Sequence, residues 1–273
     1  TRGRGVRLLA SRHSHLEDAV GQTMDRIAQV SLNTMRLLND SQKITAQNLA
    51  NLNTIGFRRD VTANIKSVYL QDNQTYEDRI FADRGTGGVD TTPSNLINTD
   101  RPMDIAINGE GFFVVKNTAG DKVLTRRGDI SPRSDGKLQT GDGSLLQGGG
   151  ADITIPPFEK IEIGQDGSIS YKPLGAEGNT LVSAGRVDLI KIPPSNIARG
   201  LDGYLRPRDG VFPQNDSTVK ISNNALETSN VNAVESMVEL IQTQRAYEMQ
   251  IKLIGTAKDL DDQTSKLMRS SGA

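Results

Sequence analysis

Near the N-terminal end of the chain, between Asp25 and Leu52, apolar residues follow a spacing of three and four positions in which Thr34 and Ser41 fill the gaps. This spacing places them on one stripe of an α-helix, and no proline interrupts the segment. We therefore predict a helix over residues 25–52, roughly 42 Å long at a rise of about 1.5 Å per residue. Its apolar stripe consists of Ile27, Val30, Leu37, Leu38, Ile44, Leu49 and Leu52.

The stretch QNLANLNTIGFRRD, residues 47–60, covers the last turn of this predicted helix and the residues after it. Gly56 can adopt the left-handed conformation that ends a helix, and Phe57 can supply the hydrophobic contact that accompanies such a cap. Arg58 and Arg59 complement the negative end of the helix dipole. Whether these arginines face solvent or form ion pairs with a neighbouring molecule stays open.

A second helical pattern runs near the other end of the chain, over residues 230–269. Ser229 or Asn230 can cap it, and Glu235 adds early negative charge. One apolar stripe consists of Val234, Met237, Val238, Ile241, Tyr247, Ile251 and Ile254, and a second of Ala246, Met249, Leu253, Ala257, Leu260 and Leu267. Leu253, Leu260 and Leu267 have heptad spacing. Two stripes on one helix need more than one neighbour.

Short runs rich in Ile, Val, Leu and Thr fill the middle of the chain and are separated by glycine turns, which indicates an antiparallel β-domain. The runs are MDIAI, GFFVVK, KVLTRR, KLQT, ADITI, KIEIG, SISYK and RVDLIKI. Gly120, Gly136, Gly143 and Gly167 stand where turns need a positive backbone dihedral. The segment ahead of this region is rich in Gly, Thr, Asn and Asp, which predicts an extended connector.

The predicted fold is thus α+β, with long N- and C-terminal helices packing as a coiled-coil-like unit and a central antiparallel β-rich domain. The first residues, which hold four arginines and both histidines, read as a non-native or disordered extension; the alternative is a basic targeting or membrane-surface segment. The predicted regions are the extension 1–23, the N-terminal helix 24–57, the connector 58–99, the β-rich domain 100–222 and the C-terminal helix 223–273.

Composition removes several classes of function. The 273 residues have a formal net charge of -1, so no global basic surface favours nucleic acid. Cysteine is absent, which excludes disulfides and thiol chemistry. No run approaches the roughly 18 apolar residues of a membrane span, and no cleavable Sec signal is evident, so we expect no membrane insertion.

Catalytic and ligand-binding motifs are weak. The only histidines, His13 and His15, lie in the N-terminal extension, and Ser134–Lys137 spells S-x-x-K only across an Asp-Gly turn. No glycine-rich loop has the strand–loop–helix context of a phosphate site, and the EF-hand ligand order is missing. We predict no catalytic residues, no metal, no cofactor and no small-molecule substrate, and therefore not an enzyme.

The apolar stripes of the terminal helices then become the most informative feature. They offer more apolar surface than one chain can cover, which indicates association, and a head-to-tail contact propagates as a ring or filament. Asn48, Asn51 and Asn53 are poor helix formers whose amides need partners, which a neighbouring molecule's backbone could supply; the alternative is simple fraying. The predicted assembly residues are the N-terminal stripe, these asparagines, Gly56, Phe57, Val234, Met237, Val238, Ile241, Ala246, Tyr247, Met249, Leu253, Leu260 and Leu267.

Three blocks of sequence resemble the axial proteins of the bacterial flagellum, the rod and hook subunits. NLANLNTIGFRRD is similar to the N-terminal signature of that family, and RPMDIAINGEGFFVVKNTAGDKVLTRRGDI to the entry of its β-domain. LETSNVNAVESMVELIQTQRAYEMQIKLIGTAKDL is similar to its C-terminal helix signature. The segment RVDLIKIPPSNIARGLDGYLRP most resembles a proximal rod subunit, with a distal rod or hook subunit as the alternative.

The resemblance implies a structural subunit of the basal-body rod that assembles with itself and other rod subunits and transmits torque from motor to hook. It also implies export by the flagellar type III apparatus, without a cleavable Sec signal, to a rod that spans the periplasm. A competing hypothesis is a binding module, in which the β-domain recognises cell-wall glycan on a helical stalk.

Overall fold

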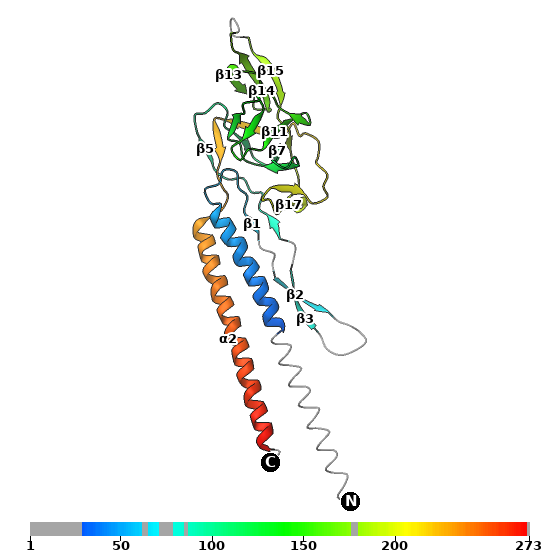
Figure 1. Ribbon diagram of the computed structural model, residues 1–273, viewed down its shortest axis with the longest axis vertical. Coiled ribbons are helices and arrows are strands. Elements are labelled where there is room, and N and C mark those ends of the chain that lie inside the picture. Colours follow the sequence, from blue (N-terminus) through cyan, green and yellow to red (C-terminus); the bar gives the residue numbers. More distant parts are fainter. Residues whose placement is uncertain (1–28, 62–64, 71–78, 85–86, 176–179, 272–273) are drawn as a thin grey trace, which may run out of the picture. The chain divides into compact units, whose positions relative to one another are not determined.

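The structure, a computed structural model, describes residues 29–61, 65–70, 79–84, 87–175 and 180–271 (Figure 1). It divides into two compact units. The helical unit comprises Thr1–Ala46, Thr62–Thr86 and Met237–Ala273, and the β-unit comprises Gln47–Val61 and Gly87–Ser236. The predicted extension 1–23 and the predicted stripe residue Ile27 lie outside the described residues. The predicted domain boundaries stay predictions.

Two helices are described. The N-terminal helix covers residues 29–50, and α2 covers Ala233–Ser271, 39 residues. The helical unit also contains an antiparallel hairpin of β2 (Ile65–Leu70) and β3 (Arg79–Arg84). The cap of α2 is Asn232, whose Oδ1 accepts the backbone N–H groups of Val234 and Glu235 at 3.0 and 3.3 Å. The prediction that Ser229 or Asn230 caps this helix is therefore wrong.

The prediction of a long N-terminal helix in a coiled-coil-like unit is also wrong. The helix ends at Ala50 and turns follow it, so it does not continue to Leu52. A coiled coil buries an apolar seam, but among the described side chains of the two helices within the helical unit the buried ones are Ser31, Thr45 and Thr243. A hydrogen bond of 3.0 Å from Gln42 Nε2 to Gln244 Oε1 joins the helices. The broad α+β class is right.

The β-unit is built on a nine-stranded antiparallel sheet in the order β17-β18-β8-β7-β11-β10-β9, with β12 paired to β11 and β16 to β7. A three-stranded sheet has the order β13-β14-β15, and three pairs join β1 to β4, β19 to β6 and β20 to β5. A single 3-10 turn, η1, covers Pro194–Asn196.

The strands of the β-unit have the following bounds: β1 Asp60–Val61, β4 Gly88–Val89, β5 Leu96–Asn98, β6 Ile105–Asn108, β7 Phe112–Lys116, β8 Lys122–Thr125, β9 Ile130–Pro132, β10 Leu138–Thr140, β11 Leu145–Gly148, β12 Ala151–Asp152, β13 Phe158–Ile163, β14 Ser168–Pro173, β15 Val182–Arg186, β16 Leu189–Ile190, β17 Ile197–Arg199, β18 Leu205–Pro207, β19 Lys220–Asn223 and β20 Ala225–Glu227. The segment interpreted as a connector, 58–99, thus contains β1 to β5.

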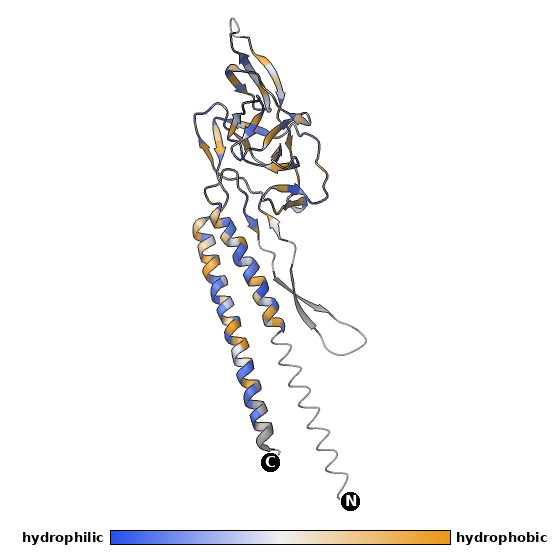
Figure 2. Ribbon diagram, in the orientation of Figure 1, coloured by the Kyte–Doolittle hydropathy of each residue, from blue (hydrophilic) through white to orange (hydrophobic). Residues whose placement is uncertain are grey.

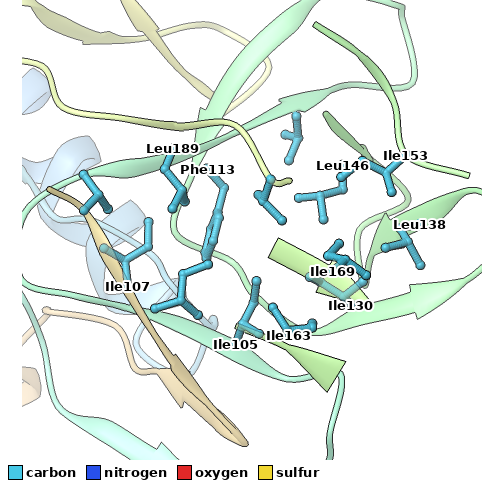
Figure 3. Close-up of a cluster of buried hydrophobic side chains, with 14 of the residues drawn as sticks. Ile105, Ile107, Phe113, Ile130, Leu138, Leu146, Ile153, Ile163, Ile169 and Leu189 are labelled. Carbon is cyan, nitrogen blue, oxygen red and sulfur yellow. The ribbon is translucent and has the colours of Figure 1, made fainter. Parts of the chain in front are cut away.

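The main core of the β-unit fills the space between these sheets (Figure 3). Phe113 and Leu189 lie on paired strands, while Ile163 and Ile169 come from the three-stranded sheet. Strand β7 is buried on both faces: Phe113 and Val115 join the main core, and Phe112 and Val114 join a second cluster. This explains the continuous apolar run of β7, since alternate residues point to opposite faces.

The turn glycines confirm the sequence prediction. Gly120, Gly136, Gly143 and Gly167 have φ values of 95°, 80°, 85° and 86°. These values lie in the region that L-residues avoid, so glycine closes these turns without steric cost.

Candidate assembly interface

Helix α2 carries exposed apolar side chains on both of its predicted stripes, and we call this set the apolar face of α2. Figure 2 shows hydrophobic residues along much of this helix. Their exposed fractions lie between 47% and 71%. The members are Val234, Met237, Val238, Ile241, Met249, Ile251, Leu253 and Leu260. Exposed apolar surface of this extent is typical of an association surface.

The remaining predicted helix residues are more enclosed. Val30 is 44% exposed. Six predicted residues are half-buried in the chain, and the side chain of Leu267 lies outside the described set. The half-buried residues are Leu37, Leu38, Ile44, Leu49, Ala246 and Tyr247. Leu52, in the turn after the helix, is half-buried too. The exposed apolar surface therefore concentrates on α2.

Asn48 is buried and finds its partners inside the chain. Its Nδ2 donates to the carbonyl of Asp60 at 2.8 Å, and its Oδ1 accepts the N–H of Asp60 at 2.9 Å. Asn51 donates to the carbonyl of Gln47 at 2.9 Å and accepts from Thr54 Oγ1 at 3.1 Å. Asn53 is exposed. The amide of Asn48 thus fixes the turn after the helix, and its role in assembly stays a prediction.

Gly56 has φ of 68°, which confirms the predicted left-handed conformation. Its N–H donates to the carbonyl of Glu227 at 2.8 Å. A Cβ at this position would lie 2.4 Å from the carbonyl carbon of Arg126. Only glycine lets the chain pass between these two segments.

Arg58 and Arg126 share one buried carboxylate. Arg58 Nη2 lies 2.5 Å from Glu227 Oε1, and Arg126 Nη1 lies 2.9 Å from Glu227 Oε2. The side chains of all three residues are fully buried. Arg126 also donates to the carbonyl of Gly109 at 2.5 Å, and the N–H of Ser94 donates to Glu227 Oε1 at 2.8 Å. Both earlier alternatives for Arg58, a solvent-facing charge and an intermolecular ion pair, are wrong.

The charges of this cluster do not cancel, because two guanidinium groups face one carboxylate. Burial lowers the pKa of Arg126 to about 10, opposed by Glu227 and assisted by Arg58. At neutral pH the group stays charged. Among the described residues, Arg58 Nε and Nη1 and Arg126 Nε have no hydrogen-bond partner. Glu227 therefore supplies the counter-charge that offsets part of the free-energy cost of burying both arginines.

Arg199 holds the other side of the same turn. Its guanidinium lies 4.6 Å from the ring centroid of Phe57 and donates to both carboxylate oxygens of Asp60 at 2.8 and 2.9 Å. It also donates to the carbonyl of Arg58. Arg59, by contrast, is partly exposed and forms an ion pair of 3.0 Å with Glu235. Phe57 thus packs within its own chain.

Sequence reasoning missed Glu227, Arg126 and Arg199. A signal for Glu227 does exist: it follows Ala225 by two residues on β20, so alternation places it on the same buried face. A carboxylate on an inward face requires a cationic partner. The local sequence pattern does not show which arginine pairs with Glu227, because Arg58 and Arg126 are both far from Glu227 in sequence.

Ligand and membrane features are few. Across the residues that the structure describes, no group of three or more His, Asp or Glu side chains is placed to hold a metal ion. No described helix is long and apolar enough to cross a membrane.

Comparison with known proteins gives two family matches. Residues 106–171 match the family described as flagellar hook protein FlgE/F/G D1 domain, and residues 222–267 match flagellar basal body rod FlgEFG protein C-terminal. The second match includes Glu227 and most of α2.

Similar proteins cover nearly the whole chain. The flagellar basal-body rod protein FlgF of Escherichia coli is 32% identical over 254 residues, which cover 91% of this chain and 100% of that protein. FlgF of Caulobacter vibrioides is 32% identical over 255 residues, 91% of this chain and 97% of that protein. FlgG of Buchnera aphidicola from Schizaphis graminum is 31% identical, covering 83% and 94%. The chain therefore belongs to the FlgF family of flagellar basal-body rod proteins.

Proposed function

We propose that the chain is a structural subunit of the flagellar rod that assembles with copies of itself and with other rod subunits through its terminal helices. The observation that carries this proposal is the apolar face of α2, with side chains 47% to 71% exposed. The rod proteins that the chain resembles support the same role.

The energetics favour contacts with several neighbours. Burying the exposed half of one aliphatic side chain contributes about 1 kcal/mol. Association costs roughly 4–15 kcal/mol in lost rotational and translational freedom. Eight such side chains contribute about 8 kcal/mol, which lies within the range of this cost. Because they lie on two stripes of α2, we expect each copy to bury its apolar face against more than one neighbour.

The turn of residues 51–60 belongs to the β-unit and is fixed within it. Asn48, Gly56, Phe57 and Arg58 are all engaged within the chain. We propose that these contacts hold the turn in one conformation in every subunit of the assembly. The subunit itself needs no catalysis and no cofactor for this role.

We place the subunit in the proximal rod, with export by the flagellar type III apparatus and a final position in the basal body. Complementation tests this placement. The gene should restore swimming to an Escherichia coli strain that lacks its FlgF, and not to one that lacks FlgG. Rescue of the FlgG-deficient strain alone would contradict the proximal position.

Fractionation tests the structural role itself. A tagged chain should copurify with detergent-extracted hook–basal bodies from the rescued strain. Recovery only in the free periplasmic fraction of swimming cells would contradict a role as a rod subunit. Retention of the full-length protein on cell-wall glycan, without recovery in basal bodies, would instead support the binding-module hypothesis.

A further inference from the structure

Strand β6 leaves the core of the β-unit at its last residue. Ile105 and Ile107 belong to the main core (Figure 3), whereas Asn108 is exposed. Gly109 follows it, and this is the only Asn-Gly pair in the chain. Glycine has no Cβ, so its main-chain nitrogen can approach the side-chain amide of a preceding asparagine without steric hindrance. The end of β6 is therefore a candidate for covalent modification.

Both groups that would react are without a hydrogen-bond partner. Within the ranges that the structure describes, this holds for the side-chain amide of Asn108 and for the N–H of Gly109. Gly109 has a φ of 89°, and a Cβ built on it would meet nothing within 4 Å, so the space beside the pair is open. The side-chain amides of Asn48 and Asn230, by contrast, are both held by main-chain groups.

Two cationic side chains lie next to this Asn-Gly pair. Arg126 Nη2 donates to the carbonyl of Gly109 at 2.5 Å. Lys220 lies directly opposite Asn108 in the antiparallel pairing of β6 with β19. Residues that are directly opposite in such a pair have their side chains on the same face, with Cβ atoms about 4.5–5.5 Å apart. The amide of Asn108 is therefore close to an ammonium group.

The neighbouring acidic residues oppose these positive charges only in part. Glu227 pairs with Arg126, but it is shared with Arg58, so the buried cluster keeps an excess of positive charge. Glu110 forms an ion pair of 2.7 Å with Lys191, and both side chains are more than half exposed. Solvent and salt screen charges at such positions. Positive charge therefore predominates around the Asn-Gly pair, and it favours an anion that forms there.

We propose that Asn108 is a site of spontaneous deamidation that needs no reactant other than water. The deprotonated nitrogen of Gly109 attacks Cγ of Asn108, and the new N–Cγ bond closes a cyclic imide. The Cγ–Nδ2 bond breaks, and the amide nitrogen leaves as ammonia after taking up a proton. Water then opens the imide. Opening at Cγ gives aspartate, and opening at the main-chain carbonyl gives isoaspartate.

The modification adds one negative charge to the β-unit and should leave it folded. An aspartate at this position faces Lys220, so the two side chains can form an ion pair. Isoaspartate lengthens the main chain, but the pairing of β6 with β19 ends at Asn108, so the added length falls at the end of the ladder. The inference does not depend on the proposed role in the rod.

Mass spectrometry of proteolytic peptides tests this proposal. The full chain is incubated at neutral and at mildly alkaline pH, and a sample digested without incubation gives the background. The peptide with Asn108 should gain the mass difference between an amide and an acid, faster at the higher pH because Gly109 must lose a proton. Labelling with an isoaspartyl methyltransferase identifies isoaspartate. Exposed Asn53, which precedes Thr54, is the internal control and should react several-fold more slowly.

A lysine substitution tests the electrostatic part of the proposal. Lys220 is exposed, so Lys220→Gln should leave the fold intact, lower the rate at Asn108 several-fold and leave the rate at Asn53 unchanged. An unchanged rate at Asn108 would overturn the contribution of Lys220. No mass gain at Asn108, or a gain no faster than at Asn53, would overturn the modification site itself.

Asn108→Asp carries the aspartate product permanently. Its thermal melting should match that of wild type, since the carboxylate is exposed and faces Lys220. A large loss of thermal stability in this variant would overturn the claim that the modified β-unit stays folded.

Discussion

Asn48 and Asp60 exchange two hydrogen bonds, one in each direction, across the turn that follows the N-terminal helix. Replacing Asn48 with Ala leaves the N–H and carbonyl of Asp60 without these partners. Each unsatisfied buried group costs about 1–3 kcal/mol, so we expect the free energy of unfolding to fall by about 2 kcal/mol. Urea denaturation measures this change.

Asn53→Ala is the matched control, because Asn53 lies in the same turn and is exposed. Its free energy of unfolding should stay within about 0.5 kcal/mol of wild type. Equal effects of the two substitutions would show that the Asn48–Asp60 pair does not stabilise the turn.

Glu227→Ala should be the most destabilising change of those considered, because it leaves Arg58 and Arg126 buried without a counter-charge. Removing one partner of a buried ion pair costs about 3–5 kcal/mol. Glu235→Ala breaks the ion pair with Arg59, but Glu235 is 60% exposed, so a loss below about 1 kcal/mol is expected. If the denaturant midpoints of the two variants differ little, the cluster of Arg58, Arg126 and Glu227 does not stabilise the fold.

Two glycine substitutions should change stability in opposite directions. Gly56→Ala places a Cβ 2.4 Å from the Arg126 backbone at a φ of 68°, so it should destabilise the β-unit by several kcal/mol. A Cβ at Gly255, inside α2, meets nothing within 4 Å. Gly255→Ala should therefore stabilise the helix by about 0.5–1 kcal/mol. Circular dichroism melting of both variants checks the two signs.

The strands and turns of the β-unit could be predicted because their signals are local. The short runs rich in Ile, Val, Leu and Thr predicted β6 to β8, and the Asp-Gly turns required the positive φ values that Gly136, Gly143 and Gly167 adopt. The existence of both helices followed from their apolar period. Which surface each apolar stripe packs against could not be predicted. A stripe that faces another helix of the chain and a stripe that faces outward have the same apolar period. Met237 and Leu253 belong to the outward kind.

The cluster around Glu227 could not be predicted for a different reason. It joins three segments that are far apart in sequence, at Arg58, Arg126 and Glu227, and no local pattern encodes their meeting. The end of the N-terminal helix was predicted too late in the sequence for the same reason, because it depends on a contact that is not encoded locally. Asn48 is held by Asp60, so the chain turns at once after Ala50 and does not continue to the glycine at 56.

Stability should fall in acid partly through Asp202. Hydrogen bonds from Arg206 lower the pKa of this carboxyl from 3.8 to about 2. A lowered folded-state pKa stabilises the fold above pH 3.8, and that contribution is lost as the pH falls toward 2. Wild type should thus be more stable than Asp202→Asn at pH 7, and the difference should shrink between pH 4 and pH 2. A constant difference across that range, measured by thermal melting, would contradict this assignment.

Assembly through the apolar face of α2 is the central claim, and sedimentation of Leu253→Asp tests it most directly. The side chain of Leu253 is 53% exposed, so the charge should not unfold the monomer. The matched control is Leu201→Asp, which places the same charge on a fully exposed leucine of the β-unit. We predict that Leu253→Asp stays in the supernatant under conditions in which wild type and Leu201→Asp pellet, with unchanged melting of the β-unit. Pelleting of Leu253→Asp to the same extent as wild type would contradict assembly through α2.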